Sequence, residues 1–177
     1  MNNFKDIAYL KEGNPKQIKA FNTINDLNLI NKLKSYTPVL TGTVPIEIDI
    51  DDSDLDIICC CKDVNLFKDV ITDYFGMHEN FSIQEKTIRD HITIVARFNF
   101  NGFLIEIFGQ DRPVDEQEAY RHMIIENKVL MEKGEDFRKQ IIELKKQGLK
   151  TEPAFAKLLG LDGDPFMELL KFGELLS

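Results

Sequence analysis

The stretch PVLTGTVPIEIDIDDSDLDIICCC, residues 38–61, decides how this chain folds. It contains an apolar lead-in, a Gly42-Thr43 turn, a loop rich in carboxylates, and the segment SDLD (residues 53–56) at the start of an apolar run. Residues two apart in a strand point to the same face, so Asp54 and Asp56 are expected side by side. Adjacent carboxylates repel each other unless a cation lies between them, and magnesium takes oxygen ligands. The stretch therefore predicts a divalent metal site.

The loop at residues 44–53 carries four further acids, namely Glu47, Asp49, Asp51 and Asp52. Its alternation of isoleucine with acids is also typical of a short edge strand with one solvent-exposed face, and that interpretation stays open for these side chains. A calcium-binding loop is excluded, because the required glycine and the terminal glutamate are absent at the right spacing.

Length and composition restrict the class of protein. The 177 residues suffice for one domain with a helical appendage, and 43% hydrophobic with 29% charged residues is typical of a globular protein. The net charge of −8 argues against polymeric nucleic acid as a partner. No apolar run approaches the ~20 residues that span a bilayer, and the N-terminus lacks the pattern of a signal peptide. We therefore expect a cytoplasmic protein without a membrane partner.

The three cysteines, Cys59, Cys60 and Cys61, are consecutive in the sequence. Consecutive strand residues alternate between faces, which suits neither mutual disulfides nor a metal site. They are interpreted as small buried hydrophobic residues of a reducing compartment.

Periodicity and turn residues predict the order of the elements. Before residue 112 we expect helices at 4–10, from Pro15 onward with an interruption at residues 25–26, and at 65–75, and strands at 39–42, 54–60, 81–88, 91–98 and 103–108. Asn101-Gly102 is the strongest hairpin signal in the chain. In the last third of the chain we expect helices at 114–131, 137–146 with exposed lysines, 151–159 and 165–172. The fold class is therefore α+β, with a mixed or antiparallel sheet, flanking helices and a C-terminal helical tail.

This order predicts an α/β core at residues 1–112 and a helical part at 113–177 packed on it. Within the core, Glu106 lies in the otherwise apolar strand 103–108. A lone acid there is costly unless it is ligated, paired or on the solvent-exposed face, and this last alternative stays open. If the strand neighbours that of Asp54 and Asp56, the ~4.8 Å strand spacing brings three carboxylates together, enough for one or two magnesium ions.

The Gly42-Thr43 turn, the Ser53–Ile57 segment and the later Ile105–Ile107 segment together resemble the polymerase-β-like nucleotidyltransferase superfamily. That family has a Gly-Ser or Gly-Gly turn, an Asp-x-Asp pair at the next strand and a third acid on a later strand. The resemblance covers about residues 15–108, and the layout of the whole chain is most similar to a small uncharacterised bacterial branch. In this chain the turn is followed by Val44-Pro45 and acids, where family loops often carry arginine and glycine.

The resemblance implies catalytic and metal-binding roles for Asp54, Asp56 and Glu106, with Glu106 also helping to deprotonate the acceptor hydroxyl. Gly42 and Thr43 would contact the phosphates, and Ser53 would orient the turn before Asp54. The implied cofactor is Mg²⁺ or Mn²⁺, and the implied substrate is a nucleoside triphosphate such as ATP. The implied reaction transfers a nucleoside monophosphate to a hydroxyl of a small molecule or a protein.

Residues outside this constellation have two possible roles. Alternation places His91 and Arg97 on one strand face, where they either meet a phosphate or acceptor or form a solvated surface. The helix that follows the sheet either covers the cleft, with Arg121 or Lys128 touching phosphate, or packs in the ordinary way with a half-buried His122. No nucleophile elbow, Walker loop or G-x-G-x-x-G motif is present.

Two alternatives to an enzyme remain from the sequence. One is a non-catalytic or antitoxin-like binding or regulatory module on the same fold, with a protein partner at the helical tail. The other is an acidic structural domain, in which Glu106 and Asp54 point away from each other.

Overall fold

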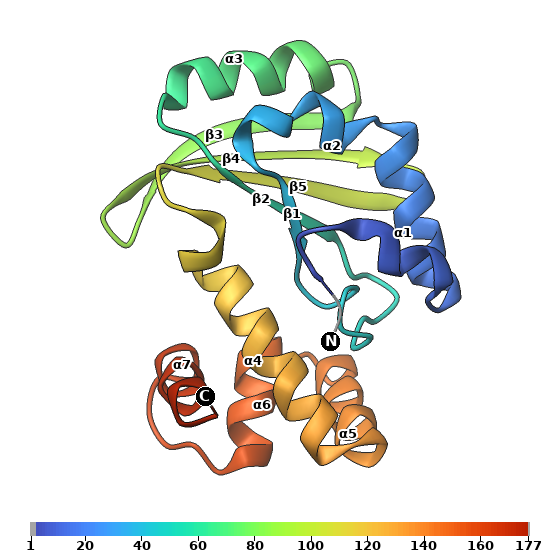
Figure 1. Ribbon diagram of the computed structural model, residues 1–177, viewed down its shortest axis with the longest axis vertical. Helices are drawn as coiled ribbons and strands as arrows, with labels where there is room; N and C mark the ends of the chain where they lie inside the picture. The colour runs from blue at the N-terminus through green and yellow to red at the C-terminus, as the bar shows by residue number, and fades with distance from the viewer. Residues whose placement is uncertain (1–2, 177) are drawn as a thin grey trace.

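The computed structural model describes residues 3–176 (Figure 1). Five strands form one mixed sheet in the order β1-β2-β5-β4-β3, in which β2 and β5 are parallel and the other neighbours antiparallel. The strands are β1 (Val39–Thr41), β2 (Leu55–Cys60), β3 (Glu79–Ile88), β4 (His91–Phe100) and β5 (Phe103–Gln110). The predicted α+β class with a mixed sheet is confirmed.

Helices precede the sheet, connect β2 to β3 and form the last third of the chain. They are the 3₁₀ helices η1 (Ile7–Glu12), η2 (Lys34–Tyr36) and η3 (Val114–Glu116), and the α-helices α1 (Pro15–Asp26), α2 (Leu29–Lys32), α3 (Val64–Phe75), α4 (Glu118–Lys133), α5 (Glu135–Lys146), α6 (Thr151–Leu159) and α7 (Pro165–Leu175). Side-chain caps fix several starts: Asn14 and Gln17 form a capping box at α1, and Asp164 caps α7 before a proline.

Two helices differ from the sequence prediction. The first helix is a 3₁₀ helix that begins three residues later than expected. Residues 44–53 form a loop, as expected, and the alternative of an edge strand is not realised there. The predicted helix 114–131 is divided into η3 and α4 because Gln117 is extended, with φ −68° and ψ 142°. Its side-chain amide donates to the carbonyls of Cys59 and Arg112, so it ties this break in the helix to the end of β2.

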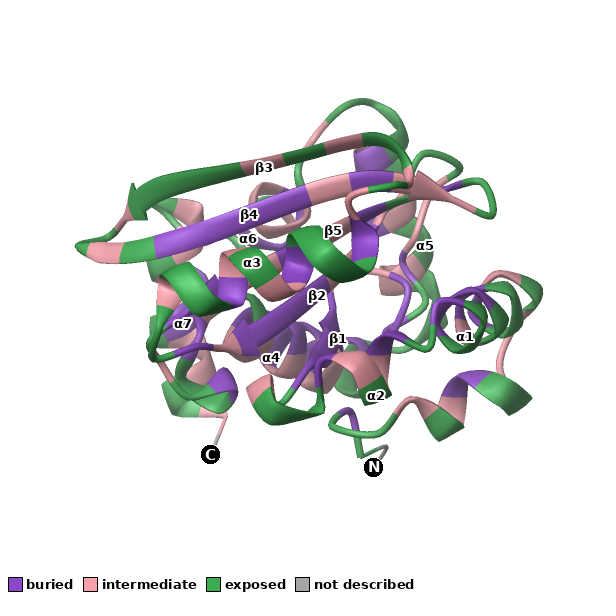
Figure 2. Cartoon of the chain, turned by 90° about the horizontal axis from the view of Figure 1, so that it is seen from above, coloured by how far each residue is buried: buried purple, intermediate pink, exposed green. Residues whose placement is uncertain are grey.

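The sheet has two unlike faces. The odd-numbered residues of β2 and β5 are buried with the even-numbered residues of β4 in one hydrophobic cluster. Helices α1, α2 and α3 cover this face, with Phe67, Ile71 and Phe75 of α3 fully buried (Figure 1). The edge strand β3 is mostly exposed while β4 is mostly buried (Figure 2). The opposite face carries Asp56 and Glu106 and lies toward the C-terminal helices.

Helices α4–α7 pack around a second hydrophobic cluster on the other side of the sheet from α3 (Figure 1). This cluster also buries Phe4, Ile46 and Ile48 from the first part of the chain. The division at residue 112 stays a prediction, and these three residues bind its two parts together. The lysines of α5 were predicted to be exposed, which is wrong for Lys145: it is 7% exposed, because its amine bonds to the Ile48 carbonyl.

The cysteines follow the prediction in part, since Cys59 and Cys61 are buried and Cys60 is partly exposed, all with free thiols. Within residues 3–176, no helix has the length and apolar character needed to cross a membrane.

Candidate active site

The register of the sheet brings the predicted acids together. Asp56 is paired with Glu106 across the parallel β2–β5 ladder, and Thr41 and Arg97 flank them on β1 and β4. Directly paired residues share a face, so these four side chains form one row across the sheet, which we call the acidic row. Asp54 lies two residues before Asp56 on the same face, toward the Gly42 turn. The sequence predicted this convergence, and the sheet produces it.

The Gly42 turn lies directly against Asp56. Gly42 has a φ of +84°, and a Cβ on it would lie 2.6 Å from the Oδ2 of Asp56. Only glycine combines this left-handed backbone with so close an approach. The predicted phosphate-binding turn is therefore open to the carboxylates, as the resemblance requires.

Ser53 connects the two ends of the loop. The hydroxyls of Thr43 and Ser53 are 3.2 Å apart, and the Ile50 amide donates to the Ser53 hydroxyl at 2.9 Å. These bonds fix the backbone that leads into Asp54. The predicted orienting role of Ser53 agrees with this placement, and contact of Gly42, Thr43 and Ser53 with a nucleotide stays a prediction.

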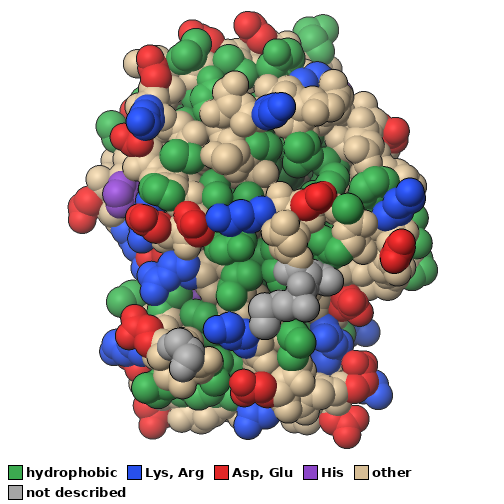
Figure 3. Space-filling view, in the orientation of Figure 1, with side chains coloured by type: hydrophobic (Ala, Val, Ile, Leu, Met, Phe, Trp, Pro, Cys, Tyr) green, Lys and Arg blue, Asp and Glu red, His purple; other side chains and the backbone are tan. Residues whose placement is uncertain are grey.

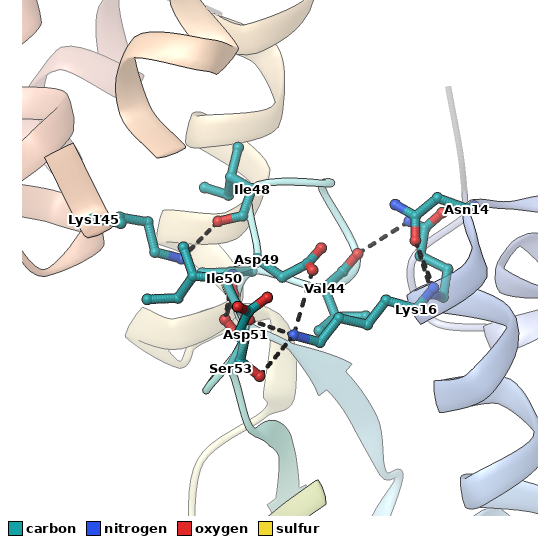
Figure 4. A network of polar contacts seen from close by, with 11 residues as sticks. Asn14, Lys16, Val44, Ile48, Asp49, Ile50, Asp51, Ser53 and Lys145 are labelled. Atoms are coloured by element: carbon teal, nitrogen blue, oxygen red, sulfur yellow. Dashed lines mark hydrogen bonds and ion pairs between the residues drawn. The ribbon is translucent and has the colours of Figure 1, made fainter. Parts of the chain in front are cut away.

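Cations from both ends of the chain bind the carbonyls of the acidic loop (Figure 4). Lys16 of α1 donates to the carbonyls of Ile50 and Asp51, and its amine lies 3.6 Å from the Asp49 carboxylate. Lys145 of α5 donates to the Ile48 carbonyl at 2.7 Å.

Arg138, also on α5, donates to the carbonyls of Ile46 and Glu47. These bonds take the place of a neighbouring strand, which explains why the loop keeps a fixed course without becoming part of the sheet. These cations bind mainly the backbone carbonyls of the loop and not its carboxylate side chains.

Arg97 forms an ion pair with Glu106. The two residues are paired across β4 and β5, and their side chains are 40% and 20% exposed. The interpretation of a solvated face therefore holds in part, since both side chains are partly exposed and also pair with each other. The Arg97 guanidinium competes with any metal ion for the oxygens of Glu106.

Asp56 carries the largest electrostatic strain of the row. Burial first, and then the neighbouring charges of Asp54 and Glu106, raise its pKa from 3.8 to about 8, against the lowering effect of Arg97. A carboxyl group that resists ionisation beside other carboxylates is typical of a functional site awaiting a cation or a proton.

The facing wall of the cleft is helical. His122 of α4 is buried, with its Nε2 2.9 Å from the Phe166 carbonyl and its Nδ1 3.7 Å from the carboxylate of Glu152 on α6. Glu152 is close enough to Asp56 to raise the pKa of that group. The side chain predicted to be half-buried therefore faces the sheet acids across the cleft.

Deeper in this wall, Glu126 and Lys145 are two buried ionisable groups. Glu126 is 3% exposed, its Oε1 has no hydrogen-bond partner in residues 3–176, and burial raises its pKa to about 8. Burial lowers the pKa of Lys145 to about 8, opposed by the nearby Glu126 charge. Sequence reasoning missed both. The detectable signal for Glu126 was an acid on the apolar stripe of α4, between Met123 and Leu130.

Two adjoining cavities share the acidic row as their common border. The first, of about 580 Å³, contains Gly42, Thr43, Ser53, Asp54, Glu126, Lys145 and Lys150. The second, of about 390 Å³, extends along the same sheet face past Ile58 and Phe108 and includes His91. Asp56, Glu106, His122 and Glu152 line both. Arg121 and Lys128, the helix cations singled out from the sequence, line neither.

The donor set suits magnesium chemically, since Asp54 and Asp56 offer oxygen ligands on one face of the cleft. As the side chains are placed, no three His, Cys, Asp or Glu residues within residues 3–176 are grouped to hold a metal ion. The Arg97–Glu106 ion pair explains part of this, because it occupies the third acid. Metal binding by Asp54, Asp56 and Glu106 stays a prediction, and it requires Glu106 to exchange its partner.

The profile of a domain of unknown function, DUF4269, matches residues 22–172. This chain belongs to the DUF4269 family. The matched segment includes the Gly42 turn, the acidic row and all four C-terminal helices up to residue 172. No curated protein sequence matches the chain.

Solved structures similar to this DUF4269 protein include a poly(U) polymerase and an RNA terminal U-transferase. The Cid1 poly(U) polymerase, as its H336N mutant bound to MgATP, matches with a TM-score of 0.55 and 11% identity, over 78% of this chain and 46% of Cid1. A cytoplasmic RNA terminal U-transferase matches with a TM-score of 0.51 and 12% identity, over 78% and 44%. The GLD-2/RNP-8 complex matches with a TM-score of 0.52 and 11% identity, over 85% and 60%.

This likeness shows that the DUF4269 chain has a nucleotidyltransferase-like fold. The chain spans about half the length of these neighbours, so their substrates and partners are not transferred with the fold. The narrower resemblance to a small bacterial branch stays a prediction.

Proposed function

We propose that this protein is a metal-dependent nucleotidyltransferase that transfers a nucleoside monophosphate from a nucleoside triphosphate to a hydroxyl group. One observation carries the proposal: Asp56 lies opposite Glu106 in the sheet, and the first cavity opens from this pair onto Asp54 and the Gly42 turn. The nucleotidyltransferase-like fold supports it independently.

The first cavity suits the triphosphate. Gly42 and Thr43 present a turn and a hydroxyl, and Lys145 and Lys150 add positive charge from the helical wall. The pKa of Lys145 is lowered to about 8 by burial, so an incoming phosphate would favour its charged form. A magnesium or manganese ion bound by Asp54 and Asp56 would neutralise the phosphates and the two carboxylates together.

The transfer itself is a displacement at the α-phosphorus. The acceptor oxygen forms a bond to that phosphorus while the bond to the bridging oxygen of the leaving pyrophosphate breaks. The acceptor proton passes to a carboxylate at the row, and Glu106 is the candidate because it lies beside Asp56 and borders both cavities. Across the cleft, His122 and Glu152 border the space where the acceptor must lie.

The acceptor is proposed to be a small molecule or a protein hydroxyl, not a nucleic acid chain. The net charge is −8, and basic and acidic side chains are interspersed on the face drawn in Figure 3. Phosphate backbones bind to continuous basic surfaces. We expect the protein to act in the cytoplasm.

The test measures binding and turnover together. Each of the four ribonucleoside triphosphates is titrated with Mg²⁺ and with Mn²⁺, and pyrophosphate release is followed with candidate acceptors. We expect metal-dependent binding that Asp54→Asn weakens at least ~10-fold, since it removes one charged ligand. Asp51→Asn, in the same loop with an exposed side chain, is the matched control and should bind normally. Binding that ignores Asp54→Asn would refute the proposal.

The Arg97–Glu106 ion pair favours one other candidate, a non-catalytic or antitoxin-like module on this fold. A guanidinium fixed on the third acid is a stable arrangement for a protein that never loads a metal. This candidate predicts a stable complex with another protein and no pyrophosphate release. Affinity purification that recovers only this chain would count against it.

A further inference from the structure

The second cavity has no part in the proposed handling of the triphosphate. It begins at the acidic row and runs along β2 and β5 away from the Gly42 turn. Its floor is the next pair along these strands, Ile58 and Phe108, followed by Gln110. At ~3.3 Å per residue, Phe108 and Gln110 lie ~7 and ~13 Å beyond Glu106, which sets the length of a fitting ligand.

The walls of this cavity are apolar near the acidic row. Phe166 of α7 and Ala119 of α4 face the sheet, and Ile88 comes from the β3–β4 hairpin. Together with Ile58 and Phe108 they offer an apolar slot, which favours a ligand with an aromatic or aliphatic body. A bare nucleotide phosphate or an extended charged chain would lose solvation there without compensation.

Charge at the far end selects the polar group of the ligand. Two arginines line the cavity, and Arg89 is paired with Glu118. Arg112 has no ion-pair partner in the described part of the chain, and its backbone is fixed by the bond from Gln117. The Oε1 of Gln117 is buried without a partner within residues 3–176, so Arg112 is the polar side chain that this end presents to a ligand.

We infer that the second cavity binds the acceptor, a small hydroxylated molecule with an apolar body and an anionic group. Its anion meets Arg112, its body lies between Phe108 and Phe166, and its hydroxyl reaches the acidic row. This inference rests on the proposed function, because the bound molecule is an acceptor only if the protein catalyses the transfer. The hydroxyl oxygen bonds to the α-phosphorus, pyrophosphate leaves, and the hydroxyl proton passes to a carboxylate of the row.

The experiment uses three phenols of similar size that differ in charge. They are 3-(4-hydroxyphenyl)propionate, an anion, 4-propylphenol, which is neutral, and tyramine, a cation. Binding to the full chain is measured by calorimetry and ligand-observed NMR, without nucleotide or metal. We expect the anion to bind about 10-fold tighter than tyramine, because one charge contact is gained and one repulsion avoided.

Arg112→Gln should abolish the preference for the anion, whereas Arg121→Gln, a control arginine that does not line the cavity, should retain it. If Arg112→Gln does not fold, Ile88→Trp serves instead, since its bulk narrows the cavity and should weaken all three phenols. Tighter binding of tyramine, an unchanged preference in Arg112→Gln, or no binding of any phenol would overturn the inference.

A titration with each magnesium–nucleoside triphosphate distinguishes the two ligands of the cleft. We expect the anionic phenol to bind alongside the nucleotide. Competitive displacement would show that the cavity takes the nucleoside, which also overturns the inference. Because the phenols are measured without metal, their failure leaves nucleotidyl transfer intact. Conversely, Asp54→Asn should abolish turnover and leave phenol binding unchanged.

Discussion

The two walls of the cleft present their ionisable groups in different ways. On the sheet wall, Asp56 and Glu106 are placed by strand register, and their spacing follows from the ladder itself. On the helical wall, His122, Glu126 and Lys145 come from two helices whose positions depend on packing in the second hydrophobic cluster. The sheet wall is therefore fixed locally, while the helical wall is adjusted through the whole tail. The difference suggests chemistry on the first and selectivity on the second.

The strongest test of this contrast compares one variant on each wall. Asp56→Asn removes a charge with little change in volume, and we expect turnover to fall by at least ~10³, about 4 kcal/mol of transition-state stabilisation. His122→Gln on the facing wall should cost no more than ~10-fold. Steady-state pyrophosphate release measures both. Equal losses in the two variants would remove the distinction between the walls.

A second test asks how much the bond from Lys145 to the loop stabilises the fold, beyond the effect of removing one positive charge from α5. Lys145→Met leaves the Ile48 carbonyl without its donor, which should lower the free energy of unfolding by ~1–3 kcal/mol. The neighbouring Lys146→Met is the matched control, since Lys146 is exposed, and should stay within ~0.5 kcal/mol. Urea denaturation gives both values. A neutral Lys145→Met would show that the stability of the fold does not depend on this bond between α5 and the loop.

The pH dependence of stability tests the helical wall through Glu126. The folded-state pKa values of Asp56 and Glu126 are both raised to about 8, above their unfolded values of 3.8 and 4.5. Their stabilising contribution is fully present below pH ~4 and is lost as the pH rises through ~8. Lys145, with its pKa lowered to about 8, adds no opposing slope until the pH exceeds that value.

We therefore expect the melting temperature of the metal-free protein to fall between pH 5 and pH 8. Glu126→Gln should reduce the accompanying loss in the free energy of unfolding by ~1–3 kcal/mol at pH 8. Thermal melts of the wild type and the variant at both pH values measure it. Parallel curves for the two proteins would mean that Glu126 is not protonated in the fold.

The smallest expected effect concerns the Arg97–Glu106 pair. Arg97→Gln should change the free energy of unfolding by no more than ~1 kcal/mol, because both side chains are partly solvated. The effect of this variant on metal binding should be small but of a definite direction: the affinity for Mn²⁺ should rise ~3-fold, because Glu106 is released from its ion pair. Manganese titration monitored by electron paramagnetic resonance measures it. Weaker binding would show that the guanidinium supports the site instead of competing for it.

The same contrast explains what the sequence could and could not predict. Strand periodicity and the Asn101-Gly102 turn predicted the strands and the face that each side chain takes, because side chains alternate regularly along strands. The convergence of Asp54, Asp56 and Glu106 was predicted only on the condition that their two strands are neighbours, which the sheet meets. The places of Glu126 and Lys145 depend on which turn of one helix meets another. Amphipathic spacing predicts that a helix packs but not which partner it meets.

Loop 44–53 was the least predictable segment for a different reason. Its alternating isoleucines and acids left an edge strand open as an alternative to a loop, and the positive φ of +60° at Glu47 rules out a regular strand there. The side chains that donate hydrogen bonds to its carbonyls belong to Lys16, Arg138 and Lys145, which are far from the loop in the sequence. No local pattern contains that information.

The hydrogen bonds that hold loop 44–53 have a further consequence, since Lys16, Arg138 and Lys145 bind mainly its backbone carbonyls. A carbonyl is common to all twenty residue types, so the loop's course does not depend on the identity of exposed residues such as Asp51 and Asp52. Those positions can be rewritten, even to arginine, without dismantling the scaffold. The charge at the entrance to the cleft can therefore change by substitution at these positions, in evolution or by engineering, and this would alter the choice of substrate.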